Sequence, residues 1–175
     1  MPLMAFVILG LLQLRPMSLY DLVKAFEAGV SLFYSASSGS IKRALDQLVA
    51  EGLVEVTAVE PGGRARKTHE ATAAGRARFR EWMSGELAGD VETAALSRLY
   101  FLGLVEPEER PAVRARILER IREDLERLER LEGSVAAMPV PDGLEDVARY
   151  QRATLGYGLA SHRAALGWFE ALDAR

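Results

Sequence analysis

The sequence of 175 residues contains no cysteine and only two histidines, His69 and His162. Without cysteine the chain can form no disulfide, no thiolate metal ligand and no cysteine nucleophile. The two histidines lie far apart in the chain, and neither occurs in a metal-ligand spacing such as H-E-x-x-H. We therefore expect no metal site and no cofactor, and a fold that is held together by packing alone.

A long hydrophobic run is also missing. The most apolar segment, residues 3–14, is too short for a membrane-spanning helix, which needs about 20 apolar residues. It also lacks the positively charged leading region and the small-residue cleavage site of a secretion signal. We interpret this segment as a buried helix, and the chain as a cytoplasmic protein without a membrane partner.

Neither sign of charge is in large excess, since the formal net charge is −3. The charges are unevenly placed, because residues 1–84 carry 10 Lys/Arg and 8 Asp/Glu, whereas residues 85–175 carry 12 and 17. A weakly basic front half and an acidic rear half favour a DNA-facing domain joined to one that does not face DNA. Because Gly85 and Gly89 mark a boundary between helices, we expect domains at residues 1–88 and 89–175.

Catalytic motifs are absent as well. The sequence has no G-x-S-x-G nucleophile elbow and no S-x-x-K element. Lys67-Thr68 matches the end of a phosphate-binding loop, but Pro61 and Arg66 stand where that motif requires glycine. We expect no enzymatic activity.

The most informative segment that is present covers residues 37–72. A helix is predicted to begin near Ser37 or Ser38 and to end at Glu51-Gly52, where glycine can adopt the left-handed cap. Strands are predicted at residues 53–56 and 68–72, joined through a Pro-Gly-Gly turn. This order of elements is typical of a recognition helix followed by a wing, which indicates DNA binding.

The other segments are predicted to be helical. Hydrophobic spacing and capping residues predict helices at residues 3–14, 19–28, 73–87, 107–137 and 144–173, with a short apolar segment at 91–105. We therefore expect a mainly α fold with a small β-hairpin, in which a winged helix-turn-helix domain precedes a C-terminal helical dimerisation bundle.

Two groups of polar side chains are candidates for contact with double-stranded DNA. The exposed side of the predicted recognition helix offers groups that can reach phosphates or base edges, and it carries Ser38, Ser40, Lys42, Arg43, Asp46 and Gln47. We select Ser38, Ser40, Lys42, Arg43 and Gln47 from this helix as DNA-binding residues. The predicted wing adds three cations that can meet a phosphate strand or the minor groove, namely Arg64, Arg66 and Lys67. Either group alone could be a solvated surface, but their adjacency favours a DNA-binding site.

The last predicted helix has two apolar stripes. One passes through Leu155, Leu159, His162, Leu166 and Phe169, and the other through Tyr150, Tyr157, Ala164 and Trp168. Two neighbouring helices of the same chain cannot easily cover so wide a surface, so we expect a homodimer.

Aromatic residues in the rear half could serve a second purpose. A pocket for a small aromatic effector could be lined by Trp82, Tyr150, Tyr157, His162 and Trp168. At helical spacing these residues could equally belong to the core or to the dimer interface.

Five short segments of the front half resemble the PadR family of bacterial transcriptional regulators: Ile8–Leu12, Pro16–Leu22, Gly39–Ile41, Glu51–Val54 and Thr72–Arg76. The resemblance implies a winged helix-turn-helix dimer that represses a nearby promoter and releases it when a small, often aromatic molecule binds. It also implies that Tyr20 lies near the DNA surface. The family usually has glycine at the position of Leu19 and tyrosine at the positions of Lys42 and His69. Because of these differences, we expect an operator sequence that differs from the one usual in the family.

These features together predict a ligand-responsive repressor that acts as a homodimer on a pseudo-palindromic operator. An alternative from another class is a protein-interaction scaffold whose winged-helix domain binds no DNA. The modest positive charge of the front half is the feature that favours this alternative.

Overall fold

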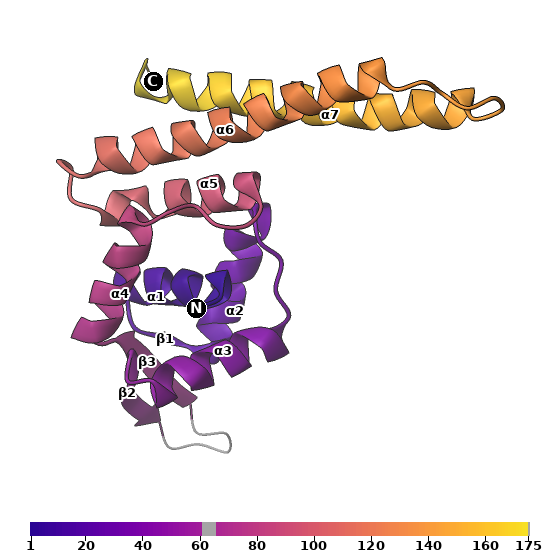
Figure 1. The fold of residues 1–175 in the computed structure, drawn as a ribbon. Coiled ribbons are helices and arrows are strands. Elements are labelled where there is room, and N and C mark those ends of the chain that lie inside the picture. The colour runs from indigo at the N-terminus through magenta and orange to yellow at the C-terminus, as the bar shows by residue number, and fades with distance from the viewer. Residues whose placement is uncertain (61–65, 175) are drawn as a thin grey trace. The chain divides into compact units, whose positions relative to one another are not determined.

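A computed structural model of the chain describes residues 1–60 and 66–174 (Figure 1). These residues form two compact units, Met1–Val113 and Arg114–Arg175. The predicted fold class is confirmed, because the structure is mostly helical with one small antiparallel sheet. Among the described residues, no helix is both long and apolar enough to cross a membrane.

Helix α1, Leu3–Leu14, lies in the middle of the first unit with α2, α3 and α4 around it (Figure 1). Every residue from Ala5 to Leu12 is buried, as the apolar sequence of this segment predicts. Gly10 is required for close packing, because a Cβ atom there would lie 2.7 Å from the ring of Phe101 and 2.8 Å from that of Phe79. The core of the first unit is therefore built around this helix.

Helix α2, Leu19–Ala28, begins with the capping arrangement that its sequence predicts. The hydroxyl of Ser18 accepts a hydrogen bond from the backbone N–H of Asp21, and the Asp21 carboxylate accepts one from the backbone N–H of Ser18 at 2.9 Å. This reciprocal pair satisfies two backbone donors that the first turn of a helix leaves free.

Helix α3, Ser38–Ala50, is capped in the same manner. The hydroxyl of Ser37 accepts a hydrogen bond from the backbone N–H of Ser40 at 3.2 Å. The helix ends at Glu51, and Gly52 has a φ of 69°, the left-handed conformation that glycine adopts without strain. The predicted bounds of this helix are therefore confirmed.

The sheet has three strands in the order β1-β3-β2, where β1 is Met17–Ser18, β2 is Val54–Glu60 and β3 is Arg66–Ala71. The hairpin of β2 and β3 was expected, although β2 extends four residues past the predicted end at residue 56. The third strand was not expected. Met17 pairs with His69, so β1 closes the sheet on the side opposite β2. The predicted Pro-Gly-Gly turn lies outside the described residues.

Helix α4, Ala73–Ser84, begins at the N-cap Thr72 and ends before Gly85, three residues earlier than predicted. A Cβ atom on Gly75 would lie 2.1 Å from the carbonyl oxygen of Leu53, so the helix and the start of the hairpin approach too closely for any larger residue. Helix α5, Val91–Tyr100, follows, and the short 3₁₀ turn η2, Leu102–Leu104, completes the segment that was expected at 91–105.

Arg98 connects α5 to the end of α4. Its side chain donates hydrogen bonds from Nη2 to the carbonyl oxygens of Trp82, at 3.2 Å, and Glu86, at 3.1 Å, and its guanidinium lies 3.9 Å from the centroid of the Trp82 ring. Burial lowers the pKa of Arg98 to about 10, so the group remains charged at neutral pH. The cation therefore stabilises the negative C-terminal end of α4.

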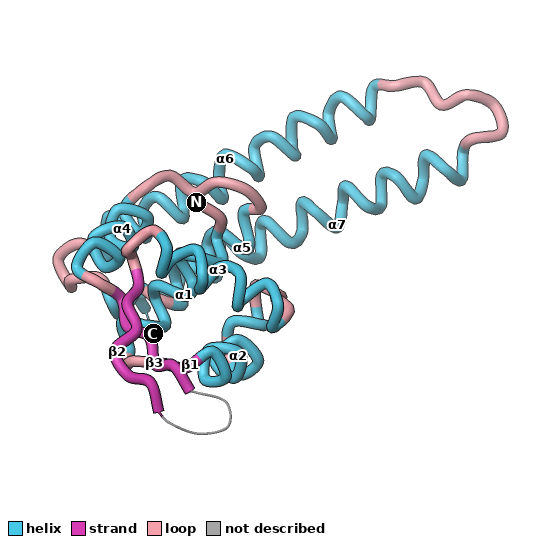
Figure 2. The backbone as a smooth tube through the Cα atoms, turned by 90° about the horizontal axis from the view of Figure 1, so that it is seen from below, coloured by secondary structure: helices cyan, strands magenta, loops and turns pink. Residues whose placement is uncertain are grey.

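The second unit is formed by α6, Arg110–Ala137, whose first residues belong to the first unit, and α7, Glu145–Glu170, followed by the 3₁₀ turn η3, Ala171–Ala174. The two helices run side by side as an antiparallel hairpin (Figure 1, Figure 2). Helix α6 begins at Arg110, three residues after the predicted start at Pro107. In the structure α5 lies in the first compact unit, which ends at Val113, and the domain boundary after residue 88 stays a prediction.

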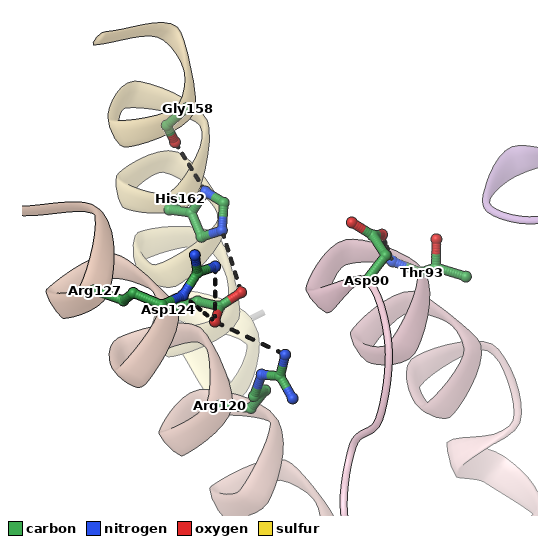
Figure 3. Close-up of polar contacts among 7 residues, drawn as sticks. All are labelled: Asp90, Thr93, Arg120, Asp124, Arg127, Gly158 and His162. Atoms are coloured by element: carbon green, nitrogen blue, oxygen red, sulfur yellow. Dashed lines mark hydrogen bonds and ion pairs between the residues drawn. The ribbon is translucent and has the colours of Figure 1, made fainter. Parts of the chain in front are cut away.

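Asp124 of α6 is the centre of a polar cluster within this hairpin (Figure 3). Its carboxylate lies 3.3 Å from a guanidinium nitrogen of Arg127, 3.8 Å from one of Arg120 and 3.9 Å from Nε2 of His162 on α7. The other ring nitrogen of His162 is 2.8 Å from the carbonyl oxygen of Gly158. Within this cluster, the contact between His162 and Asp124 joins α7 to α6.

Candidate nucleic-acid interface

One face of α3 is buried and the other is open to solvent. Ile41, Leu45 and Leu48 are buried in the first unit. The opposite side consists of exposed polar residues, among them Ser38, Lys42, Arg43, Asp46 and Gln47. The hydrophobic spacing of the helix thus orients a row of polar groups outward, beginning at its N-terminus.

Some of these groups already have partners on the same helix. The ammonium of Lys42 lies 2.5 Å from a carboxylate oxygen of Asp46, and the side-chain amide of Gln47 donates a hydrogen bond to Glu51 at 2.8 Å. The hydroxyl of Ser40 donates to the carbonyl oxygen of Ser37 at 2.8 Å, so it contributes to the helix cap. Lys42 and Gln47 would have to exchange these partners in order to contact a ligand.

A cleft of about 770 Å³ separates α3 from the start of α2 and from β3. Its walls bring together segments that are distant in sequence, and the lining residues are Ser18, Leu19, Tyr20, Val23, Ser38, Lys42, Leu45, Asp46, Lys67 and His69. Four of the predicted DNA-binding residues therefore surround one cleft: Tyr20, Ser38, Lys42 and Lys67.

Tyr20 lies at the mouth of this cleft with 66% of its surface exposed. The ammonium of Lys24, one helical turn later, lies 5.8 Å from the centroid of its ring. Lys24 was not among the predicted site residues, although its i+4 spacing from Tyr20 was a signal in the sequence. Its ammonium also pairs with a carboxylate oxygen of Glu27 at 2.8 Å, so its charge is already balanced on the same helix.

The wing is only partly described. Lys67 is exposed and its backbone pairs with Val59 across the hairpin. The backbone of Arg66 pairs with Glu60, but its side chain and the whole of Arg64 lie outside the described residues. Of the three predicted wing cations, only Lys67 is thus placed at the cleft.

His69 lies on β3 beneath the cleft, where its side chain is buried. Its Nδ1 atom is 3.3 Å from the carbonyl oxygen of Met17 on β1. Burial lowers the pKa of His69, and the nearby charge of Lys67 acts in the same direction, while the hydrogen bond to Met17 and the charge of Asp46 oppose this. The neutral imidazole is therefore the favoured form at this position.

The five predicted effector residues are divided between the two units. Trp82 belongs to the first unit, where it stacks on Phe6 with a centroid distance of 5.0 Å and carries the guanidinium of Arg98 over its ring. His162 belongs to the Asp124 cluster of the second unit. Tyr150, Tyr157 and Trp168 are exposed on α7.

Two family models match the chain. Residues 8–81 match the transcriptional regulator PadR-like family, and residues 94–175 match the C-terminal region of virulence activator alpha. The first match covers the segment from α1 through β3 into α4, including the whole interface described above. No curated protein sequence matches the chain significantly.

Solved structures resemble the chain over nearly its whole length. They include PadR of Bacillus subtilis in complex with operator DNA, with 22% identity, 99% of this chain and 98% of that chain covered, and a TM-score of 0.47. The same protein in complex with p-coumaric acid has 21% identity, coverage of 96% and 92%, and a TM-score of 0.42. The virulence activator AphA of Vibrio cholerae has 26% identity, coverage of 95% and 94%, and a TM-score of 0.42.

These structural likenesses are too distant to transfer a ligand or an operator sequence. The match to the PadR-like family model is more specific than these structural likenesses. It covers α3, the hairpin of β2 and β3, and all residues that line the cleft. The resemblance to PadR regulators expected from the sequence is confirmed. Residues 8–81 of the chain, which include this interface, belong to the PadR-like family of transcriptional regulators.

Proposed function

We propose that the protein regulates transcription by binding double-stranded DNA as a homodimer, with α3 in the major groove and the hairpin of β2 and β3 beside it. The observation that carries this proposal is the exposed polar edge of α3, which borders the same cleft as Tyr20 and Lys67. Helix-turn-helix domains dock in this manner, with the N-terminal residues of the recognition helix at the base edges. The site of action would be the cytoplasm.

The side chains at this edge suit two kinds of contact. Lys42 and Arg43 can donate hydrogen bonds to guanine edges or to phosphates, and Gln47 can pair with adenine. Tyr20 and Lys67 line the cleft at positions suited to the phosphate backbone, where contacts fix orientation rather than sequence, and Lys24 lies beside the ring of Tyr20. Ser38 is exposed at the first position of the helix and has a hydroxyl able to contact a phosphate.

A homodimer is supported by the apolar surface of the second unit. Exposed apolar and aromatic side chains of the α6–α7 hairpin and its tip include Leu131, Met138, Leu144, Val147, Tyr150, Tyr157 and Trp168. Soluble proteins often bury exposed apolar side chains of this size against a partner, and two-fold dimers are the commonest solution. A two-fold dimer would read two half-sites about one helical turn, or a multiple, apart.

We further propose that the regulator acts as a repressor and that a small aromatic molecule relieves repression. Tyr150, Tyr157 and Trp168 are exposed on α7, where Arg149 lies over the ring of Tyr150 and Phe169 contacts that of Trp168, whereas Trp82 is engaged with Phe6 and Arg98. Because the proposed dimer would bury the same stripe of α7, such a ligand would act at the dimer contact. The resemblance to the PadR family is the basis for proposing repression and its relief. Expression of a reporter gene placed behind the operator, with and without the aromatic molecule, would measure both.

Selection of genomic DNA fragments by the purified full-length protein tests the proposal. The recovered fragments should share an inverted repeat, and a duplex of that sequence should bind more tightly than a scrambled duplex of equal length. A dimer that enriches no sequence and binds no duplex at low salt would instead support a protein-interaction scaffold.

A further inference from the structure

Asp46 is an acid on the face of α3 that is directed toward DNA in the proposed function. Its carboxylate lies 2.5 Å from the ammonium of Lys42, and the two side chains are 61% and 59% exposed. Asp46 also lines the cleft that Tyr20 and Lys67 border. A negative charge therefore stands among the groups that would meet a negatively charged ligand.

Helix stability is a weak reason for an acid at this position. An i,i+4 ion pair supports a helix best when the acid precedes the base, but here Lys42 precedes Asp46. Exposed pairs of this kind contribute little in any case. The pair also withdraws the charge of Lys42 from non-specific phosphate binding, because the ammonium is already neutralised by a neighbour.

The groove of a DNA duplex offers one kind of group that a carboxylate can bind. Phosphates repel it, whereas the exocyclic amino group of cytosine donates a hydrogen bond to Asp or Glu in the major groove. Lys42 can donate to guanine O6 and N7 in the same groove. Four helical residues rise about 6 Å along the helix axis, so Lys42 and Asp46 would read base pairs within one or two steps of each other.

We propose that Asp46 is a specificity-determining residue, which accepts a hydrogen bond from a cytosine amino group in the operator and disfavours DNA without a cytosine there. On a matching site, Lys42 leaves Asp46 for a neighbouring guanine. On any other sequence, the DNA offers the Asp46 carboxylate no amino group at this position, and Asp46 keeps its ion pair with Lys42. This inference rests on the proposed DNA binding and adds to it the residue that rejects wrong sequences.

The test compares full-length Asp46→Ala with the wild-type protein on the selected operator and on a scrambled duplex. Loss of a base contact should weaken operator binding by about 5- to 150-fold. Binding to the scrambled duplex should become tighter, because a negative charge has been removed. The ratio of operator affinity to scrambled-duplex affinity should therefore decrease by a larger factor than operator affinity itself.

Glu81→Ala is the matched control. Glu81 is also exposed and pairs with Arg78 on α4 of the same unit, at 2.5 Å, so the two variants change net charge equally. This control should leave the ratio of operator to scrambled affinity unchanged. The same result for Asp46→Ala would overturn the inference.

Asp46→Asn provides a second variant that preserves size. Asparagine reads adenine by donating and accepting at once, so the preferred base at one operator position should change from cytosine to adenine. A set of duplexes with each base at each position measures this. An unchanged preference at every position contradicts the inference, whereas a wild-type protein without preference for any duplex would refute DNA recognition itself.

Discussion

At the scale of single residues, His69 links stability to pH. Burial lowers its pKa in the folded protein, so the unfolded chain binds a proton at this residue first as the pH falls. Protonation of His69 should therefore leave the free energy of unfolding unchanged above about pH 6.5, the ordinary pKa of histidine. Below about pH 6.5 the free energy of unfolding should decrease as the pH falls. Urea unfolding between pH 5 and 8 measures this dependence.

Replacement of the imidazole isolates the contribution of His69 to this pH dependence. His69→Gln keeps a polar side chain but removes the titrating group, so its unfolding free energy should decrease less between pH 6.5 and 5 than that of the wild type. Equal slopes in the two proteins would show that protonation of His69 is not coupled to folding.

Gly75 provides a test of packing at one atom. A methyl group at this position would lie 2.1 Å from the carbonyl oxygen of Leu53, and a backbone atom cannot move aside as a side chain can. Gly75→Ala should destabilise the protein by about 3 kcal/mol, which thermal or urea unfolding would detect. Gly103→Ala is the control, because nothing lies within 4 Å of the added methyl, and it should be nearly neutral.

At the scale of elements, Arg98 is the tie between α4 and α5. The side chain is 2% exposed, and it binds two carbonyl oxygens at the end of α4 while it covers the Trp82 ring. Arg98→Ala should lower the unfolding free energy by about 3 kcal/mol, since it leaves those carbonyl oxygens without a charged donor. Arg98→Lys should lose less, because it keeps the charge. A neutral effect of Arg98→Ala would contradict this role.

Elements with strong local signals could be predicted from the sequence. Helix α3 begins and ends where Ser37 and Gly52 predict, because caps act within one turn of the chain. Strand β1 could not be predicted. It has two residues, too few for an alternating pattern, and its pairing of Met17 with His69 joins positions 52 residues apart.

The start of α6 was misplaced for a related reason. Two prolines, Pro107 and Pro111, both suit the first turn of a helix, where no backbone N–H is needed. The sequence favoured the first, but the helix begins at Arg110 and has Pro111 in its first turn. The Nε–H of Arg110 donates a hydrogen bond to the carbonyl oxygen of Val105 at 2.8 Å, a short-range contact to the preceding loop that neither hydrophobic spacing nor a capping residue indicates.

The candidate site was predictable in part. The residues on the exposed face of α3 follow from the spacing of Ile41, Leu45 and Leu48, which fixes the opposite face. The cleft could not be predicted, because it depends on how α2, α3 and β3 pack together. Its floor contains Leu19 and Val23, whose apolar side chains give no functional signal in the sequence.

At the scale of the whole molecule, the two stripes of α7 behave differently. The stripe with Leu159 and Phe169 is buried or half-buried, whereas the stripe with Tyr150, Tyr157 and Trp168 is exposed. This uncovered stripe is where we expect a second copy to pack. Tyr157, with 77% of its surface exposed, is the residue to change.

Tyr157→Asp should raise the dissociation constant of the dimer by about 30-fold, because a buried interface would then contain an unpaired charge. Light scattering across a dilution series measures this, and Ala115→Asp, at an exposed position of α6 outside this stripe, serves as the control. Operator affinity should decrease with the loss of dimer. A monomeric wild-type protein, or a variant that dimerises equally well, would contradict this assignment.

The most direct measurement for the molecule as a regulator is the affinity of the full-length dimer for its selected operator across a range of salt concentrations. We expect log affinity to decrease linearly with log salt, with a slope near −0.9 for each phosphate contact. The double variant Arg43→Ala/Lys67→Ala should bind more weakly with a shallower slope. If the intact dimer binds no duplex at low salt, or if its affinity does not change with salt, the exposed face of α3 is not a DNA-binding surface.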